Sequence, residues 1–147
     1  MTTVAFDGRF IAADTMADHS GLKMPVCKIY RTENIVLAGA GMHHQIAAYF
    51  RKVKDLDLAT ILSLGYPDYD AEKNYPGMIL IGRGNPTLAY YLGADTWMKM
   101  GRKYHSVGSG RDFALAAMAL GKTAHEAVEL ASTFDVYTGG SVDCFEV

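Results

Sequence analysis

The segment Thr2-Thr3-Val4-Ala5-Phe6-Asp7-Gly8-Arg9-Phe10-Ile11-Ala12-Ala13-Asp14 carries the strongest local signal for the fold. Its Asp7-Gly8 dipeptide is typical of a tight turn between two antiparallel strands. We therefore expect residues 2–6 and 9–14 to form a β-hairpin. Two more hairpins are predicted further along the chain, one from residues 25–30 with 35–40 and one from residues 78–81 with 87–92.

Helices are predicted where apolar residues recur at helical spacing. They begin after Gly41, after Gly110 and at a capping box formed by Thr123 and Glu126, and residues 56–64 predict one or two further turns. The apolar stripe expected after Gly110 is Phe113, Ala116, Ala117 and Leu120. Strands that pair as hairpins indicate antiparallel sheets with helices packed outside them. The sequence thus predicts two such sheets face to face, in a single α+β domain over residues 1–147.

Composition excludes several classes of function. The 147 residues include 14 basic and 16 acidic side chains without a basic block, so nucleic acid is not an expected partner. No apolar run approaches the roughly 18 residues of a membrane span, and no signal peptide is recognisable. Cys27 and Cys144 lack metal-ligand spacing, and the adjacent His43 and His44 point different ways. We expect a cytoplasmic protein with no membrane partner, no metal and no cofactor.

The two ends of the chain carry the residues with the clearest chemistry. Thr2 follows the initiator Met1, so removal of Met1 leaves a threonine with a free α-amine. Such a residue holds a nucleophile and a base, because the amine can take the proton of the hydroxyl. The other end contains Asp135-Val136-Tyr137-Thr138-Gly139-Gly140, which by itself predicts only a turn.

Taken in order, these motifs resemble the N-terminal-nucleophile hydrolases, specifically proteasome β subunits and the HslV-type peptidase of bacterial ATP-dependent proteases. The resemblance covers residues 2–50 and 78–147. Its anchors are Met-Thr-Thr-Val at the start, Ile-Ala-Ala-Asp at 11–14, Lys28, Ala-Gly-Ala-Gly at 38–41, Val-Gly-Ser-Gly at 107–110 and Asp-Val-Tyr-Thr-Gly-Gly from 135. The fold it implies is a four-layer αββα sandwich of two antiparallel sheets flanked by helices.

The resemblance also implies a role for each site residue. Thr2 is the expected nucleophile, Lys28 the active-site lysine that keeps the α-amine neutral, and Asp14 the acid that holds Lys28. Ser109, Asp135 and Thr138 are expected to support the Thr2 amine, and the Gly41 N–H to stabilise the oxyanion. By residue chemistry alone, Lys28 also fits a solvated strand face, Asp14 a turn, and Ser109 with Gly110 a helix N-cap. Alternation along the first strand turns Thr3 to the other face, so Thr3→Ala is expected to be mild.

The activity implied is that of an N-terminal-threonine peptidase, a homo-oligomeric ring acting on peptides or unfolded proteins, in a bacterial cell or encoded by a phage. The chain is short at 55–77, where members of the family carry a full second helix. In the bacterial proteases an ATPase unfoldase docks on the face that carries this helix. The short segment therefore argues against such a partner here. The alternative is a catalytically silent protein of the same fold with a structural or assembly role, for example in a bacteriophage particle. The short chain and retention of Met1 favour that alternative.

Overall fold

The computed structural model describes residues 2–70, 72–73 and 76–147. The elements in chain order are β1 (Thr3–Phe6), β2 (Phe10–Asp14), β3 (Met16–His19), β4 (Leu22–Pro25), β5 (Ile29–Arg31), β6 (Ile35–Ala40), α1 (His43–Val53), α2 (Leu58–Leu64), β7 (Gly77–Gly82), β8 (Leu88–Gly93), β9 (Thr96–Lys99), β10 (His105–Gly108), α3 (Arg111–Ala119), α4 (Ala124–Phe134) and β11 (Val142–Glu146). All strand pairings in the described ranges are antiparallel, as the hairpin pattern predicts.

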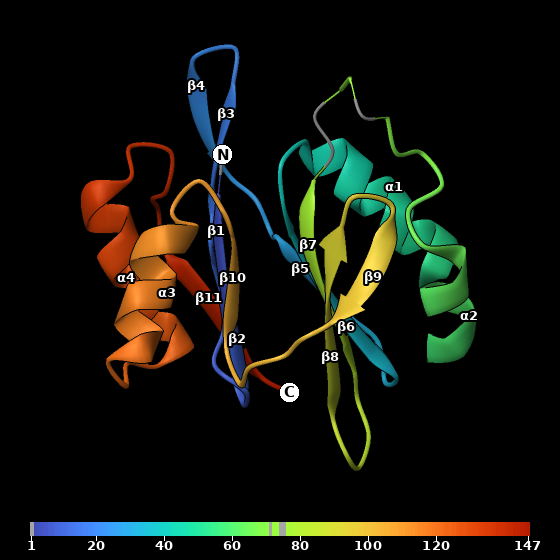
Figure 1. Ribbon diagram of the computed structural model, residues 1–147. Helices are drawn as coiled ribbons and strands as arrows, with labels where there is room; N and C mark the ends of the chain where they lie inside the picture. The colour runs from blue at the N-terminus through green and yellow to red at the C-terminus, as the bar shows by residue number, and fades with distance from the viewer. Residues whose placement is uncertain (1, 71, 74–75) are drawn as a thin grey trace.

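These strands form three sheets (Figure 1). One sheet has the order β10-β1-β2-β11, a second has the order β5-β6-β7-β8-β9, and the third is the β3–β4 hairpin. The predicted four-layer αββα sandwich of two sheets is therefore wrong as stated. The third sheet, which projects beyond the packed body in Figure 1, has no counterpart in that prediction, and the four helices of the described residues are short.

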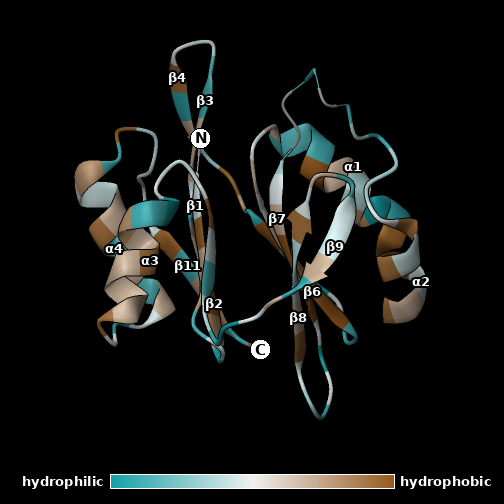
Figure 2. Ribbon diagram, viewed as in Figure 1, coloured by the Kyte–Doolittle hydropathy of each residue, from teal (hydrophilic) through white to brown (hydrophobic). Residues whose placement is uncertain are grey.

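The hairpin that sequence analysis missed is held by backbone geometry rather than by burial. Ser20 and Gly21 form its two-residue turn, and both have positive φ, as a type I′ turn requires. Its side chains are mostly exposed, including Leu22 and Met24, so the strands lack the alternation of buried and exposed residues that reveals a strand in sequence. Figure 2 shows polar and apolar residues mixed along it.

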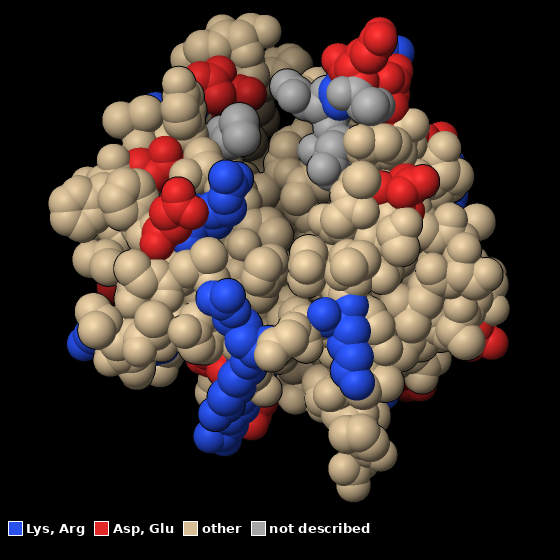
Figure 3. Space-filling view, in the orientation of Figure 1, with Lys and Arg blue, Asp and Glu red and all other residues tan. Residues whose placement is uncertain are grey.

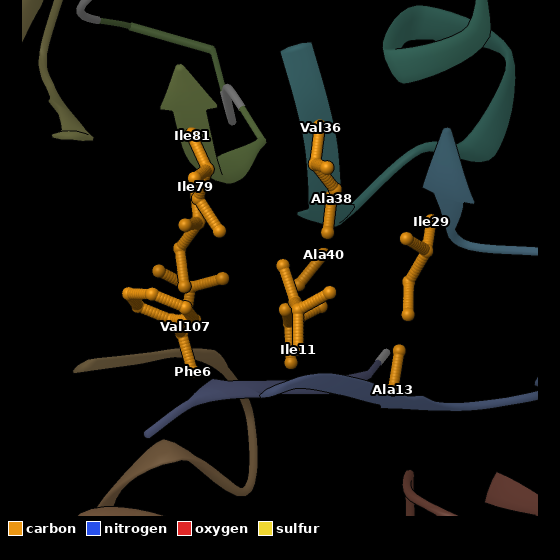
Figure 4. Close-up of a cluster of buried hydrophobic side chains, with 11 residues drawn as sticks. Phe6, Ile11, Ala13, Ile29, Val36, Ala38, Ala40, Ile79, Ile81 and Val107 are labelled. Atoms are coloured by element: carbon orange, nitrogen blue, oxygen red, sulfur yellow. The ribbon is translucent and has the colours of Figure 1, made fainter. Parts of the chain in front are cut away.

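The main core lies between the two large sheets. Phe6, Ile11 and Ala13 of the four-stranded sheet point toward Val36 and Ile79 of the five-stranded sheet (Figure 4). All of these side chains are buried. Because β1 and β6 are buried along their whole lengths, they do not alternate between apolar and polar residues: β6 is apolar throughout, and β1 is apolar after Thr3. This core fixes where the ends of β1 and β6 lie relative to one another.

The helices cover the outer faces of the large sheets (Figure 1). Helices α3 and α4 pack on β1 and β2 mostly through small side chains, which allow close approach of the helices to the sheet. Helices α1 and α2 share a second cluster with the five-stranded sheet, centred on Tyr49 and Trp97. The stripe predicted for α3 is partly wrong, because Ala114, Ala117 and Met118 are buried whereas Phe113 is exposed.

Asp7 joins the first hairpin to helix α4. One carboxylate oxygen accepts from the backbone N–H groups of Arg9 and Phe10, at 2.9 and 2.7 Å, and the other accepts from the Ala124 N–H at 2.8 Å. The Thr123–Glu126 capping box at the same helix end is present as predicted. Asp7 therefore serves as a second cap for α4.

Replacing Asp7 with alanine is expected to lower the free energy of unfolding by about 2 kcal/mol, since three backbone donors lose their acceptor. Urea denaturation measures this directly. Asp18→Ala is the matched control. Among the described residues Asp18 accepts from one backbone N–H, that of Gly21 in the exposed β3–β4 turn, and its loss is expected to cost about 0.5 kcal/mol or less. Equal losses in the two variants contradict the capping role.

None of the helices in the described ranges has both the length and the apolar character needed to span a membrane.

Candidate active site

The peptide group between Thr2 and Thr3 is held at both ends. Its carbonyl, on Thr2, accepts from the backbone N–H of Ser109 at 2.8 Å. Its N–H, on Thr3, donates to Oδ1 of Asp14 at 3.0 Å. Both residues are buried where β1 begins, in the middle of the four-stranded sheet. The backbone of Thr2 is thus fixed in orientation by two separate segments of the chain.

Asp14 and Lys28 form a buried ion pair beside this peptide group. Lys28 Nζ lies 3.0 Å from Oδ1 of Asp14, the atom that also accepts from Thr3 N. The two donors are therefore separated by no more than twice that distance. Asp14 Oδ2 accepts from the Gly139 N–H at 3.1 Å, so three donors converge on one carboxylate. The prediction that Lys28 lies within reach of Asp14 is confirmed, and its side chain does not face bulk solvent.

Burial dominates the electrostatics of Lys28. Desolvation lowers the pKa of its ammonium below the usual value, although the charge and hydrogen bond of Asp14 act in the opposite direction. Lys28 Nζ also donates to the Met16 carbonyl at 2.6 Å, which ties the base of the β3–β4 hairpin to the ion pair. A second positive charge placed near this ammonium is disfavoured, because the site is shielded from water.

A second cluster is built around the carboxylate of Asp135. This residue occupies the C-cap position of α4. Its Oδ2 accepts from the hydroxyls of Ser109 at 2.6 Å and Thr138 at 2.5 Å. Burial alone would raise the pKa of Asp135, but the hydrogen bonds from Ser109, Thr138 and the Tyr137 N–H outweigh it, and the pKa lies below the usual value. The carboxylate is therefore ionised at neutral pH and acts only as an acceptor.

Ser109 connects the Asp135 cluster to Thr2. Its N–H bonds the Thr2 carbonyl, while its hydroxyl donates to Asp135 and lies 3.4 Å from the same carbonyl. One hydroxyl hydrogen serves one acceptor well, so the shorter bond to Asp135 prevails. Of Ser109 and Gly110, the two residues that also fit a helix N-cap, Gly110 occupies the N-cap of α3 and Ser109 does not, and no side chain caps that helix.

Thr3 is a member of the site that sequence analysis left out. Its hydroxyl lies 2.7 Å from that of Thr138, and its side chain has no exposure. The sequence expectation that Thr3→Ala is mild assumes that alternation turns Thr3 away from the site, but the Thr3 hydroxyl contacts Thr138. The sequence does show two consecutive threonines, Thr2 and Thr3. Strand alternation by itself does not indicate that the second of them belongs to the site.

Two glycines make room for this arrangement. Gly108 has a φ of +105°, and a Cβ there would lie 1.8 Å from the Thr2 carbonyl oxygen. Gly110 has an ordinary φ, yet its Cβ would lie 2.1 Å from the Thr3 hydroxyl oxygen and 3.2 Å from that of Thr138. The Gly-Ser-Gly segment therefore lets the backbone on both sides of Ser109 approach β1 closely.

Gly110→Ala tests the Thr3–Thr138 contact without imposing an unusual backbone conformation. The added methyl overlaps the Thr3 hydroxyl, so we expect the protein to lose about 1–3 kcal/mol of stability through overpacking, together with any activity of the site. Thermal and urea unfolding measure the first effect. Gly121→Ala is a poor control because its φ is +91°, whereas Gly101→Ala meets nothing within 4 Å and is expected to be neutral. A neutral Gly110→Ala contradicts the geometry of this contact.

Gly41, the predicted oxyanion donor, directly follows β6. Its neighbour Ala40 lies close to Gly108, so the end of β6 comes near the Thr2 backbone. Met1, on which the free amine depends, lies outside the described residues. Figure 3 shows the surface hollowed at its upper edge, between the two sides of the molecule and beside the start of β1 in this view.

A cavity of about 560 Å³ lies next to the site, between the β3–β4 hairpin and the segment that follows α4. Four residues of the site also line this cavity, namely Met16, Asp135, Thr138 and Gly139. Neither Thr2 nor Lys28 lines it. It therefore flanks the site instead of containing it. Among the described residues, no three His, Cys, Asp or Glu side chains are grouped to bind a metal ion.

No known protein family matches this sequence, and no curated protein matches it either. Solved structures with a similar fold exist for BPH from Thiobacillus denitrificans. BPH in complex with epoxomicin has a TM-score of 0.73 and 20% identity, covering 100% of this chain and 98% of that one. A second BPH structure has a TM-score of 0.72 and 21% identity, covering 100% and 97%. At this level of identity the likeness concerns the fold.

Proposed function

We propose that this chain is an N-terminal-threonine peptidase of the proteasome β-subunit and HslV type, acting in a homo-oligomeric ring. The observation that carries the proposal is the convergence of a buried Lys28–Asp14 pair and an ionised Asp135 cluster on the Thr2–Thr3 peptide group. Perturbed, mutually bonded ionisable groups of this kind are costly in a buried position, and they concentrate at functional sites.

In the proposed reaction the Thr2 hydroxyl attacks the carbonyl carbon of a peptide bond. Its proton passes to the Thr2 α-amine, directly or through a water, and then to the departing amine of the substrate. The acyl group stays on the Thr2 oxygen as an ester, which a water molecule then hydrolyses with the same amine as base. An α-amine with an ordinary pKa near 8 suits this role near neutral pH.

The surrounding residues support these steps in different ways. The Lys28 ammonium disfavours a positive charge on the nearby amine and so keeps the base free. Ser109 and Thr138 bond to Asp135, and these three residues are the proposed acceptors of hydrogen bonds that orient the amine. The Gly41 N–H is the proposed donor to the negative oxygen of the tetrahedral intermediate.

The similarity of fold to BPH supplies a probe. BPH has been solved in complex with epoxomicin, so we propose that the form of this chain starting at Thr2 also binds that compound. Epoxomicin is expected to raise the melting temperature of this form and to inhibit its peptidase activity. A parallel measurement on Thr2→Ala shows whether binding depends on the nucleophile.

The test compares two purified forms of the protein that differ by one residue. In one, cleavage of a fusion leaves Thr2 first; in the other, Met1 precedes it. We expect the first form to hydrolyse small peptides and the second to be inactive, because its Thr2 nitrogen is an amide and cannot act as a base. Native mass spectrometry of both forms reports the oligomer.

Two results overturn the proposal. If the Thr2 form is inactive on peptides, alone and with ATPase unfoldases, the chain is not a peptidase, and the structural or assembly role takes its place. If the Met1 form is equally active, hydrolysis does not use the α-amine. A monomer in native mass spectrometry contradicts only the ring.

A further inference from the structure

Thr3 links the two charged groups of the site, one by a direct hydrogen bond and the other through Thr138. Its backbone N–H donates to Asp14, which holds Lys28, and its hydroxyl contacts Thr138, which donates to Asp135. The residue is fully buried in β1, the inner strand between β10 and β2. Its peptide N–H belongs to the same planar group as the Thr2 carbonyl. Any shift of Thr3 therefore turns the backbone of Thr2.

The direction of the hydroxyl bond follows from the charge of Asp135. An ionised carboxylate only accepts, so Thr138 must use its single hydroxyl hydrogen toward Asp135. The Thr138 oxygen is then the acceptor for Thr3, and Thr3 is the donor. The result is an ordered chain from Thr3 through Thr138 to Asp135, with Ser109 donating to the same carboxylate oxygen.

We propose that Thr3 is a positioning residue, whose hydroxyl sets the orientation of Thr138 and Asp135 and thereby the placement of the Thr2 nucleophile and amine. The inference rests on the proposed function. It replaces the prediction from the sequence that Thr3→Ala has only a mild effect. Hydrogen bonds in a chain polarise one another, so loss of the first donor also weakens the bond from Thr138 to Asp135. Gly110, whose missing side chain leaves space for the Thr3 hydroxyl, fits the same role.

Three substitutions at this position separate hydrogen bonding from shape. Thr3→Val keeps the shape but places a methyl 2.7 Å from the Thr138 oxygen, closer than the 3.5–4.0 Å or so that nonbonded carbon contacts prefer. Thr3→Ala removes the hydroxyl without this crowding, and Thr3→Ser keeps the hydroxyl. In the form that starts at Thr2, we expect kcat to fall about tenfold in Thr3→Val and Thr3→Ala with KM nearly unchanged, and to return within about twofold of wild type in Thr3→Ser.

Ser106→Ala is the control for general loss of a buried hydroxyl. Ser106 is buried on the neighbouring strand β10, and its hydroxyl donates to the Val4 carbonyl at 2.7 Å without touching the site. It is expected to lose stability but to keep kcat. If Thr3→Ala and Ser106→Ala change kcat equally, or if only the crowded Thr3→Val is slow, the positioning role is refuted.

Amide hydrogen exchange tests the inference independently of activity. The two amides that clamp the Thr2–Thr3 peptide group are those of residues 3 and 109. We expect both to exchange about tenfold faster in Thr3→Ala than in Ser106→Ala, and at the wild-type rate in Thr3→Ser. Unchanged exchange in Thr3→Ala overturns the inference even in an active enzyme. An inactive wild type with the expected exchange pattern overturns the proposed function and leaves the structural coupling in place.

Discussion

Thr2→Ala, in the form that begins at residue 2, is expected to reduce peptide hydrolysis to background, a loss on the order of 10⁴-fold or more. The substitution removes the nucleophilic oxygen and keeps the α-amine. It also keeps the Thr2 carbonyl that Ser109 bonds, so the fold is expected to lose about 1 kcal/mol or less. Steady-state hydrolysis of a small fluorogenic peptide and thermal unfolding are the measurements.

Thr2→Ser is the companion to this variant, because it restores a hydroxyl at the same atom. Activity well above that of Thr2→Ala is expected, with a lower kcat than wild type because the methyl that restrains the χ1 rotamer is gone. Hydrolysis by Thr2→Ala at more than a tenth of the wild-type rate contradicts the assignment. The protein then cleaves peptides through another group, or the preparation contains another peptidase.

Lys28→Met is expected to damage both stability and chemistry. Asp14 remains buried with a charge and no counter-ion, so we expect a loss of about 3–5 kcal/mol and a fall in melting temperature of about 10 °C or more. We expect kcat to fall on the order of 10²- to 10³-fold. Removal of the ammonium also raises the pKa of the Thr2 α-amine, so the acid limb of kcat/KM moves to higher pH.

The double variant Asp14→Asn with Lys28→Met separates the two effects. It removes both charges, and the side-chain amide oxygen introduced at position 14 can still accept from Thr3 N, so part of the lost stability is expected to return. Activity is not expected to return with it, because the ammonium is still absent. Recovery of activity along with stability indicates that Lys28 acts only on the fold. An unshifted acid limb in Lys28→Met contradicts its electrostatic role.

Local signals in the sequence predicted much of the fold. The first hairpin and its Asp7-Gly8 turn, the antiparallel pairing and the capping box of α4 each depend on a few adjacent residues, and the structure confirms them. The β3–β4 hairpin was missed because its side chains are mostly exposed and its turn depends on two positive φ angles. Its presence makes three sheets where two were predicted.

The candidate site was predictable in part. Lys28 pairs with Asp14, as the resemblance implies. Ser109 and Thr138 lie together with Asp135 and bond to it, and the support of the Thr2 amine by these three residues stays a prediction. The involvement of Thr3, the Met16 carbonyl and the Gly139 N–H was not predicted, because backbone groups carry no sequence signature and a buried threonine on a strand is commonplace. The role of Gly110 likewise depends on a contact between distant segments, which appears only when α3 is docked on β1.

The order in which the chain is made has a consequence for this site. The ribosome delivers Thr3 early and Thr138 late, 135 positions apart, and β1 pairs with β10, whose residues also come late. A nascent chain therefore carries the threonine hydroxyl long before any of its later partners exists. Contacts of such long range also form slowly after release. Under the proposed function an unfinished polypeptide is therefore inactive, and we expect activity only once the last third of the chain has folded onto β1.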